Sequence, residues 1–248
     1  MDLDHPSALC EKLAGGDLDV ALVSSFEFLR NPIYRIVDDV SVSSAGPVYS
    51  VVVAYLGETS EIEEIELDPA SETAVNLLRC LLMESGLHPR LVQASAGCQR
   101  LVTGSLPATS NAQLLIGDQA LRFRQNYRGE FRFWDLGEQW QKLVGLPFVY
   151  ALWLVRPEVV DLEPIADRVR ALRDKNLANL DQLIAEVVAG IADPGRGQEF
   201  NPEFLSRYYR EHLRFGFGKK EKEGLQTFAD LCEKHGLLPK RDLALDLV

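Results

Sequence analysis

Two long apolar runs, residues 48–55 and 148–155, limit the possible folds of this 248-residue chain more than any other feature. Both are rich in β-branched and aromatic residues, as in strands that are buried on both faces of a sheet. The residues between them alternate short apolar runs with helical periodicity, which is typical of βα units. This order predicts a chain that leaves one lobe, builds a second lobe and then returns to the first.

The predicted division places residues 1–56 and 150–248 in the first lobe and residues 57–149 in the second. The two apolar runs are then hinge strands, and the ligand binds in the cleft between the lobes. Residues beyond 157 show helical periodicity, with one helix expected over 202–215 and the last one ending at Gly236.

Small and hydroxyl-bearing residues follow the predicted strands, at the strand ends where open α/β sheets bind their ligands. They are Ser24, Ser43, Ser44, Ser71, Thr73, Gly117 and Asp118. Residues 39–46 are predicted to form a loop that leaves backbone donors free. The helix that begins after Ser71 has an N-terminus that favours an anion, and Asp118 is a candidate base. Ordinary helix caps and turns are the competing interpretation.

The charge and hydropathy of the chain narrow the classes of partner. A net charge of −11 argues against a nucleic-acid or anionic-membrane surface, because both need a basic face. A small anion remains compatible, since a few local donors can outweigh the global charge. The hydrophobic content of 46% is sufficient for a packed core, and no apolar run is long enough to span a membrane. The oligomeric state stays open.

Cysteine usage and the first residues indicate a compartment. Cys10, Cys80, Cys98 and Cys232 are scattered and form no CxxC pair, so we expect neither a metal site nor a redox motif. Reduced cysteines are typical of cytosolic proteins. The first residues show no basic segment followed by an apolar one, so we expect no secretory signal and a cytoplasmic location.

Several short segments, taken together in their order and spacing, resemble the chorismate dehydratase family of the futalosine route to menaquinone. They are LDVALVSS at 18–25, SSAGPVYS at 43–50, LD with SET at 67–73, LIGDQAL at 115–121, DLG through Trp140 to GLPFV at 135–149, and EGL at 223–225. Each segment alone has little specificity, whereas the ordered set covers nearly the whole chain.

The resemblance implies a type II periplasmic-binding-protein-like α/β fold with a hinged cleft, which works in the cytoplasm as an enzyme. It implies removal of water from chorismate to give 3-[(1-carboxyvinyl)oxy]benzoate, with no metal and no organic cofactor. A substrate with two carboxylates needs two anion sites, for which the N-terminus at Ser71–Thr73 and then the Ser43–Ser44 segment are the candidates. The base is Asp118 or a carboxylate of the substrate, since every histidine lies outside the shared segments.

Three other functions compete with this interpretation. The sister enzyme 1,4-dihydroxy-6-naphthoate synthase has a His-Glu pair where this chain has Gly117-Asp118, which favours the dehydratase. A solute-binding protein without activity conflicts with the expected absence of a secretory signal. A non-catalytic cytosolic paralogue that binds or senses a small anion remains open, although no DNA-binding region is apparent.

The resemblance also implies an N-terminal strand and a loop with Tyr-Leu-Asn, and this sequence contains no Tyr-Leu-Asn. The first strand of a doubly wound lobe is usually central, so its loss would expose apolar surface. We therefore expect a truncated or mis-started chain, less stable and less active than its relatives. The competing interpretation is a divergent paralogue, and the reading frame upstream of Met1 distinguishes the two.

Overall fold

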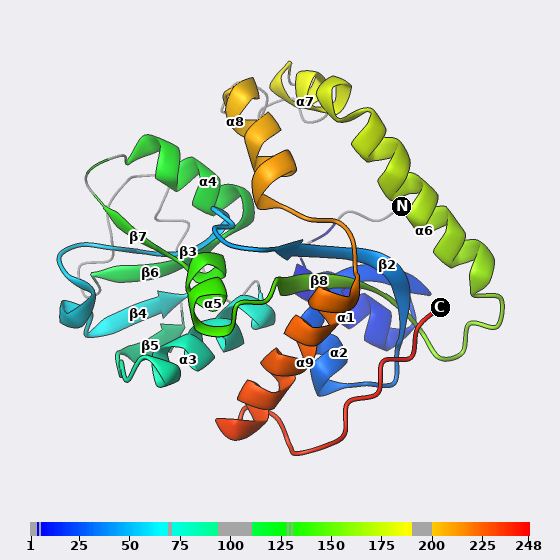
Figure 1. Ribbon diagram of the computed structural model, residues 1–248, viewed down its shortest axis with the longest axis horizontal. Helices are drawn as coiled ribbons and strands as arrows, with labels where there is room; N and C mark the ends of the chain where they lie inside the picture. The colour runs from blue at the N-terminus through cyan, green and yellow to red at the C-terminus, as the bar shows by residue number, and fades with distance from the viewer. Residues whose placement is uncertain are drawn as a thin grey trace.

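Two β-sheets lie side by side at the centre of the computed structural model, with helices packed around them (Figure 1). The structure describes residues 4, 6–68, 71–93, 111–127, 129, 131–189 and 200–248. Among the described residues, no helix has the length and apolar character needed to cross a membrane.

The first sheet has three strands in the order β1 (Val20–Ser24), β8 (Phe148–Val155) and β2 (Arg35–Ser44). β8 is the central strand and is antiparallel to both neighbours, so both of its backbone edges are hydrogen-bonded. Helix α1 (Pro6–Gly15) packs on β1, and α2 (Ser25–Arg30) and α9 (Lys219–Lys234) pack on β8. The chain near its C-terminus returns beside β2, where Leu247 bridges to Ile36.

The second sheet has five strands in the order β5, β4, β6, β3 and β7. Their bounds are β3 Val51–Tyr55, β4 Glu64–Leu67, β5 Arg90–Gln93, β6 Ala112–Ile116 and β7 Arg132–Asp135. A short 3-10 turn, Thr59–Glu61, precedes β4. Helices α3 (Glu72–Glu84), α4 (Gly117–Asn126) and α5 (Leu136–Val144) connect or cover these strands.

Two chain segments connect the sheets, the first crossing segment (residues 45–50) and the second crossing segment (residues 145–147). The first runs from β2 to β3 and the second from α5 to β8. The start of the first lies beside the end of the second, because Ser44 pairs with Phe148. Gly224 of α9 lies against the second segment, where a Cβ atom would collide with the carbonyl oxygen of Pro147. This close approach explains why glycine stands in the 223–225 segment.

The apolar run at 48–55 is therefore divided differently from the prediction. Its strand begins only at Val51 and pairs with β6 and β7, so it belongs to the second sheet, whereas the prediction placed it in the first lobe. The run at 148–155 forms β8 of the first sheet as expected. Strand pairing determines which sheet an apolar run joins, and this cannot be read from its apolar content alone. The division into two hinged lobes stays a prediction.

Three helical elements form an arm over one side of the sheets (Figure 1). They are α6 (Glu163–Ala178), α7 (Leu180–Val188) and α8 (Pro202–Arg207). The helix predicted over 202–215 ends early, because a π-helical turn, Tyr208–His212, follows α8 directly. That turn brings Tyr208 onto the first crossing segment, where its hydroxyl donates to Ser50 Oγ at 2.9 Å.

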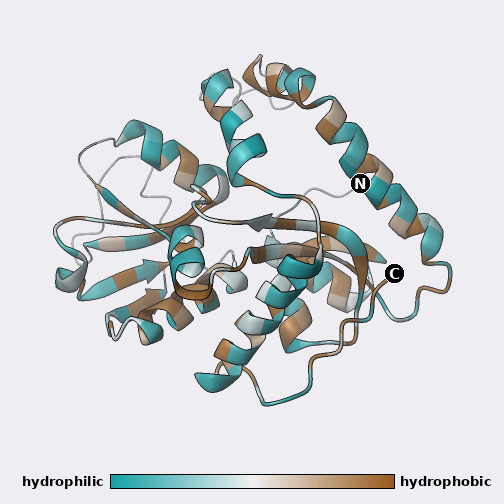
Figure 2. Ribbon diagram, viewed as in Figure 1, coloured by the Kyte–Doolittle hydropathy of each residue, from teal (hydrophilic) through white to brown (hydrophobic). Residues whose placement is uncertain are grey.

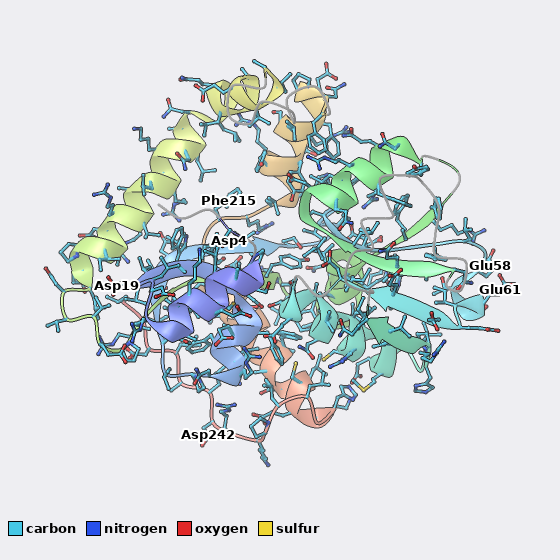
Figure 3. All side chains as sticks on the ribbon, turned by 180° about the vertical axis from the view of Figure 1, so that it is seen from behind. Asp4, Asp19, Glu58, Glu61, Phe215 and Asp242 are labelled. Carbon is cyan, nitrogen blue, oxygen red and sulfur yellow. The ribbon has the colours of Figure 1, made fainter. Side chains whose placement is uncertain are left out.

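A continuous apolar core joins the two sheets. It includes Val23 and Leu152 of the first sheet and Val53 and Ile65 of the second, and Figure 2 shows apolar residues along the central strands. Acidic side chains such as Asp19, Glu58 and Asp242 lie at the periphery (Figure 3). Much of the core packing is therefore shared between the sheets.

The core also contains two thiols from different helices. Cys80 of α3 and Cys232 of α9 are both fully buried, and their Sγ atoms are 3.8 Å apart. Close by, Glu84 of α3 pairs with Lys234 and with His235 Nε2 at 2.6 Å. Helix α9 therefore holds α3 against the first sheet by both apolar and charged contacts. Cys98 lies outside the described residues.

Candidate functional site

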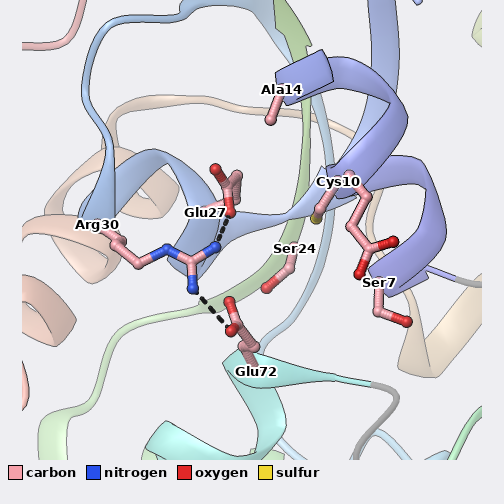
Figure 4. A pocket seen from close by; sticks show the side chains of 8 residues that line it. Ser7, Cys10, Ala14, Ser24, Glu27, Arg30 and Glu72 are labelled. Atoms are coloured by element: carbon pink, nitrogen blue, oxygen red, sulfur yellow. Dashed lines mark hydrogen bonds and ion pairs between the residues drawn. The ribbon is translucent and has the colours of Figure 1, made fainter. Parts of the chain in front are cut away.

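A cavity of about 300 Å³ opens at the carboxyl end of β1 (Figure 4). Helix α1 forms one wall, the end of β1 and helix α2 form the floor and the opposite wall, and the first turn of α3 closes it. The lining side chains are those of Ser7, Cys10, Glu11, Ala14, Ser24, Glu27, Arg30 and Glu72. The cavity is thus lined by elements that belong with the first sheet (α1, β1 and α2) and by α3, which belongs with the second.

A cluster of hydroxyl groups joins β1 and α2 to α3 beside this cavity. The hydroxyls of Ser24 and Thr73 are hydrogen-bonded to each other. The backbone N–H of Phe26 donates to Thr73 Oγ1 at 3.0 Å, and Ser25 Oγ lies 3.3 Å from the same atom. Thr73 is only 1% exposed. Of the predicted site residues, Ser24 and Thr73 are thus in direct contact.

The N-terminus of α3 is built as a capped helix start. Ser71 Oγ accepts the backbone N–H of Ala74 at 3.2 Å, so this hydroxyl caps the helix. Glu72, the first helical residue, projects its carboxylate into the cavity (Figure 4). The helix start that the sequence offers as an anion site therefore lies on the cavity, and Ser71 shapes it through the cap.

Three charged side chains of the cavity wall, Glu27, Arg30 and Glu72, are connected by ion pairs. Arg30 of α2 donates to Glu27 through Nη2 and to Glu72 Oε1 through Nη1, the latter at 2.8 Å. Glu27 is 3% exposed, and a buried carboxylate is stable only with such a partner. Arg30 therefore connects α2, which packs on the first sheet, to α3, which belongs with the second.

Among the described residues that line the cavity, Cys10 supplies the one thiol. Burial raises its pKa to about 11, and the neighbouring Glu27 carboxylate adds to this effect. The thiol is then protonated near neutral pH, so it does not act as a nucleophile there. Among the described residues, no cluster of three or more His, Cys, Asp or Glu side chains could hold a metal ion.

Ser43 and Ser44 lie away from this cavity. Both belong to β2 and are buried, so the prediction that they form a loop with free donors is wrong. Ser44 Oγ donates to the carbonyl of Gly46 at 3.1 Å and lies 3.1 Å from Tyr150 Oη, while Ser43 Oγ faces the carbonyl of Arg214. The strand extends further because the returning segment at Arg214 pairs with it.

Gly117 and Asp118 form the first turn of α4, beside the first crossing segment rather than on the cavity lining. Gly117 has a φ of 57°, and its N–H donates to the carbonyl of Ser50 at 2.7 Å. Asp118 is exposed. Burial raises the pKa of Tyr208 and of Tyr209, and the charge of Asp118 adds to this effect in both. Asp118 is therefore near two aromatic hydroxyls of the π-helical turn.

Sequence reasoning missed the residues that carry charge on the cavity, namely Glu27, Arg30 and Glu72. A usable signal was present, because Glu27 and Arg30 stand at i and i+3 in a helix whose other residues are mostly apolar. A carboxylate at a buried position indicates either a bound cation or a site.

The sequence of this chain matches a described family along most of its length. The family, described as menaquinone biosynthesis, matches residues 2–234. A chorismate dehydratase from Thermus thermophilus is 28% identical over 240 residues, which are 91% of this chain and 83% of that protein.

Solved structures with low identity share the fold. The alkanesulfonate-binding protein from Xanthomonas axonopodis pv. citri, bound to MOPS, has a TM-score of 0.64 at 16% identity and covers all of this chain and 86% of its own. The periplasmic aliphatic sulphonate binding protein from Escherichia coli has a TM-score of 0.59 at 16% identity, covering 98% and 82%. The α/β periplasmic-binding-protein-like fold that the sequence predicts is thus confirmed, and the chain belongs to the menaquinone biosynthesis family.

Proposed function

We propose that this protein is a chorismate dehydratase, a hydro-lyase that converts chorismate into 3-[(1-carboxyvinyl)oxy]benzoate and water. The observation that carries the proposal is the cavity between the end of β1 and the N-terminus of α3 in a chain of this family. The 28% identical Thermus relative bears the name of that activity. We place the enzyme in the cytoplasm and its substrate among small dianions.

The proposed reaction needs binding and orientation more than an extreme base. A proton leaves one ring carbon, hydroxide leaves its neighbour, and the ring becomes aromatic, which supplies driving force. The hydroxyl of Ser24, which lines the cavity, and the first turn of α3 offer hydrogen bonds to an oxygen of the substrate, and the buried hydroxyl of Thr73 positions Ser24. Holding the substrate in one orientation lowers the entropic part of the barrier.

The proton acceptor is proposed from two groups. Asp118 is exposed at the start of α4 and does not line the cavity, so it acts as base only if the substrate extends toward the crossing segment. A carboxylate of the substrate is the second choice and needs no protein base. Replacing Asp118→Asn separates them, because turnover persists only in the second case. Ser43, Ser44 and Gly117 stay proposed substrate contacts on that same side.

The direct experiment is to incubate the purified protein with chorismate, without added metal, and to detect the benzoate product by its mass. We expect one product molecule for each chorismate consumed. A protein that binds chorismate tightly and returns it unchanged is a sensor or a non-catalytic paralogue, and that result contradicts the proposal.

A further inference from the structure

Arg30 lies between two carboxylates of the cavity that differ in how firmly they hold it. The Glu27 side chain is 4% exposed and belongs to the same short helix, whereas the Glu72 side chain is 43% exposed and comes from α3. A buried carboxylate that loses its cation is left uncompensated, which is costly. A half-exposed carboxylate is readily solvated when it loses a partner. Arg30 therefore has one fixed and one exchangeable partner.

The charge of the cavity wall is unfavourable for the proposed substrate. Among the described lining residues, Glu11, Glu27 and Glu72 are carboxylates, and Arg30 supplies the only cationic side chain. A dianion that enters this cavity is repelled unless a cation turns toward it. The hydroxyl of Ser24 provides a hydrogen bond but no charge.

We propose that Arg30 binds a carboxylate of the substrate, that Glu27 holds the guanidinium in place, and that Glu72 is displaced when the substrate enters. This inference rests on the proposed function, because it takes the substrate to be a dicarboxylate. The guanidinium presents several N–H donors in a planar fork, so Nη2 can stay on Glu27 while Nη1 exchanges one carboxylate for another.

The exchange also explains why a negative residue stands at the mouth of an anion site. In the structure, Glu72 holds Arg30 across the cavity and joins α2 to α3. A substrate carboxylate replaces that contact, and Glu72 then faces solvent. Substrate specificity follows from this competition, since an uncharged analogue cannot displace Glu72.

Two single variants test the exchange with opposite expected signs. Arg30→Gln removes the cation and should raise KM for chorismate roughly 10- to 100-fold, with a smaller change in kcat. Glu72→Gln weakens the competitor and should lower KM by roughly two- to fivefold. If Glu72→Gln raises KM as Arg30→Gln does, the contact is only a structural bridge and the proposal is overturned.

A matched control distinguishes the cavity from general loss of an ion pair. Arg132→Gln removes a half-exposed arginine that pairs with Glu58 at the edge of the second sheet. Its KM should equal that of the wild type. An equal rise of KM in Arg132→Gln and Arg30→Gln would contradict a specific role for Arg30.

Folding is controlled separately, because Arg30→Gln leaves Glu27 buried without its cation. The double variant Glu27→Gln/Arg30→Gln removes both charges and should fold while keeping the raised KM. If the double variant binds chorismate as the wild type does, Arg30 is not the carboxylate contact.

Binding of a second compound, which needs no turnover, tests the role of Arg30 independently of the proposed reaction. Isophthalate, a rigid benzene dicarboxylate, is titrated into each variant by calorimetry. Failure of the wild type to turn over chorismate rejects the function alone. Arg30 is then supported if isophthalate binds the wild type and loses roughly tenfold or more in affinity in Arg30→Gln. Equal affinity in the two proteins, or no binding to either, overturns the inference.

Discussion

Two arginine–carboxylate clusters in this protein use the same groups in different ways. Asp135 at the start of α5 accepts Val48 N at 3.0 Å, Tyr49 N at 2.8 Å and Arg124 Nη1 at 3.2 Å. It also accepts two N–H groups from the first turn of its own helix. At the cavity, Arg30 instead divides its donors between a buried and a half-exposed carboxylate.

The two clusters differ in how much of each is buried and hydrogen-bonded. Asp135 is 3% exposed, and its carboxylate oxygens accept hydrogen bonds from backbone N–H groups of the first crossing segment and of α5. Arg124 also lies 4.1 Å from the ring of Tyr49, whose φ of 65° is unusual for a residue with a side chain. The cluster at Asp135 therefore fixes the path of the chain, whereas the cluster at Arg30 retains one replaceable contact.

The largest loss of stability should come from breaking the cluster at Asp135. Asp135→Ala leaves several buried N–H groups and Arg124 without their acceptor, and we expect a loss of about 3–5 kcal/mol in the free energy of unfolding. Urea denaturation measures it. Arg132→Gln, which breaks a peripheral, solvent-screened pair, should leave the free energy of unfolding close to that of the wild type. Similar losses in both variants would remove the distinction between the clusters.

A smaller effect should come from crowding the same region. A Cβ atom at Gly137 would lie 2.6 Å from the carbonyl oxygen of Gly46 and 2.8 Å from Ser44 Oγ. Gly137→Ala should therefore cost about 1–3 kcal/mol through overpacking. At Gly15, the last residue of α1, a Cβ atom meets nothing within 4 Å, so Gly15→Ala is the matched control. If Gly137→Ala left the free energy of unfolding unchanged, the first crossing segment would be able to move aside for the added methyl group, which would contradict the prediction.

Much of this architecture could be predicted from the sequence. Apolar runs and helical periodicity gave the helix at 72–84 and the strand at 148–155 to within a residue or two. Hydroxyl residues at strand ends drew attention to Ser24 and Thr73, which the structure brings into contact, whereas their role in binding stays a prediction. These patterns succeed because they depend on local spacing and on burial.

The rest depends on pairing between distant segments. Residues 41–44 are in a strand because β8 and the segment at Arg214 pair with them, and no local pattern reports those partners. The cavity charge was missed for the same reason, since Glu72 meets Arg30 only after α2 and α3 pack together. Sequence spacing within one helix does not reveal contacts across two.

A variant pair at the helix start should separate capping from binding. Ser71→Ala/Thr73→Ala removes the cap of α3 and the buried hydroxyl that accepts the N–H of Phe26. We expect about 1 kcal/mol less stability from the cap, a further loss of about 1–3 kcal/mol from the unpaired N–H, and a KM raised roughly tenfold. Asn201→Ala removes the corresponding cap of α8, where Asn201 Oδ1 accepts Glu203 N at 2.8 Å. That control should lose only about 1 kcal/mol with unchanged KM, and a changed KM would contradict the assignment.

The smallest effect should be a pH dependence at the contact of α3 with α9. Hydrogen bonds from Lys234 and then His235 lower the pKa of Glu84. The stabilisation is therefore complete above the ordinary pKa of glutamate and is lost as the pH falls through the lowered pKa of the folded state. Denaturation at pH 6 and at about pH 3.5 should show a smaller loss in Glu84→Gln than in the wild type. Equal losses would assign the acid sensitivity elsewhere.

The thiol pair Cys80 and Cys232 has a consequence for handling the protein. The hydrogen bond between the thiols and their burial raise the pKa of Cys232, so the reactive thiolate is rare while the core is closed. Transient opening in the presence of a disulfide oxidant would let the two sulfurs couple, releasing two protons and two electrons. The product would be a covalent ring closed from residue 80 to residue 232, which would clamp α3 to α9. Storage with a thiol reductant therefore preserves any movement between those helices.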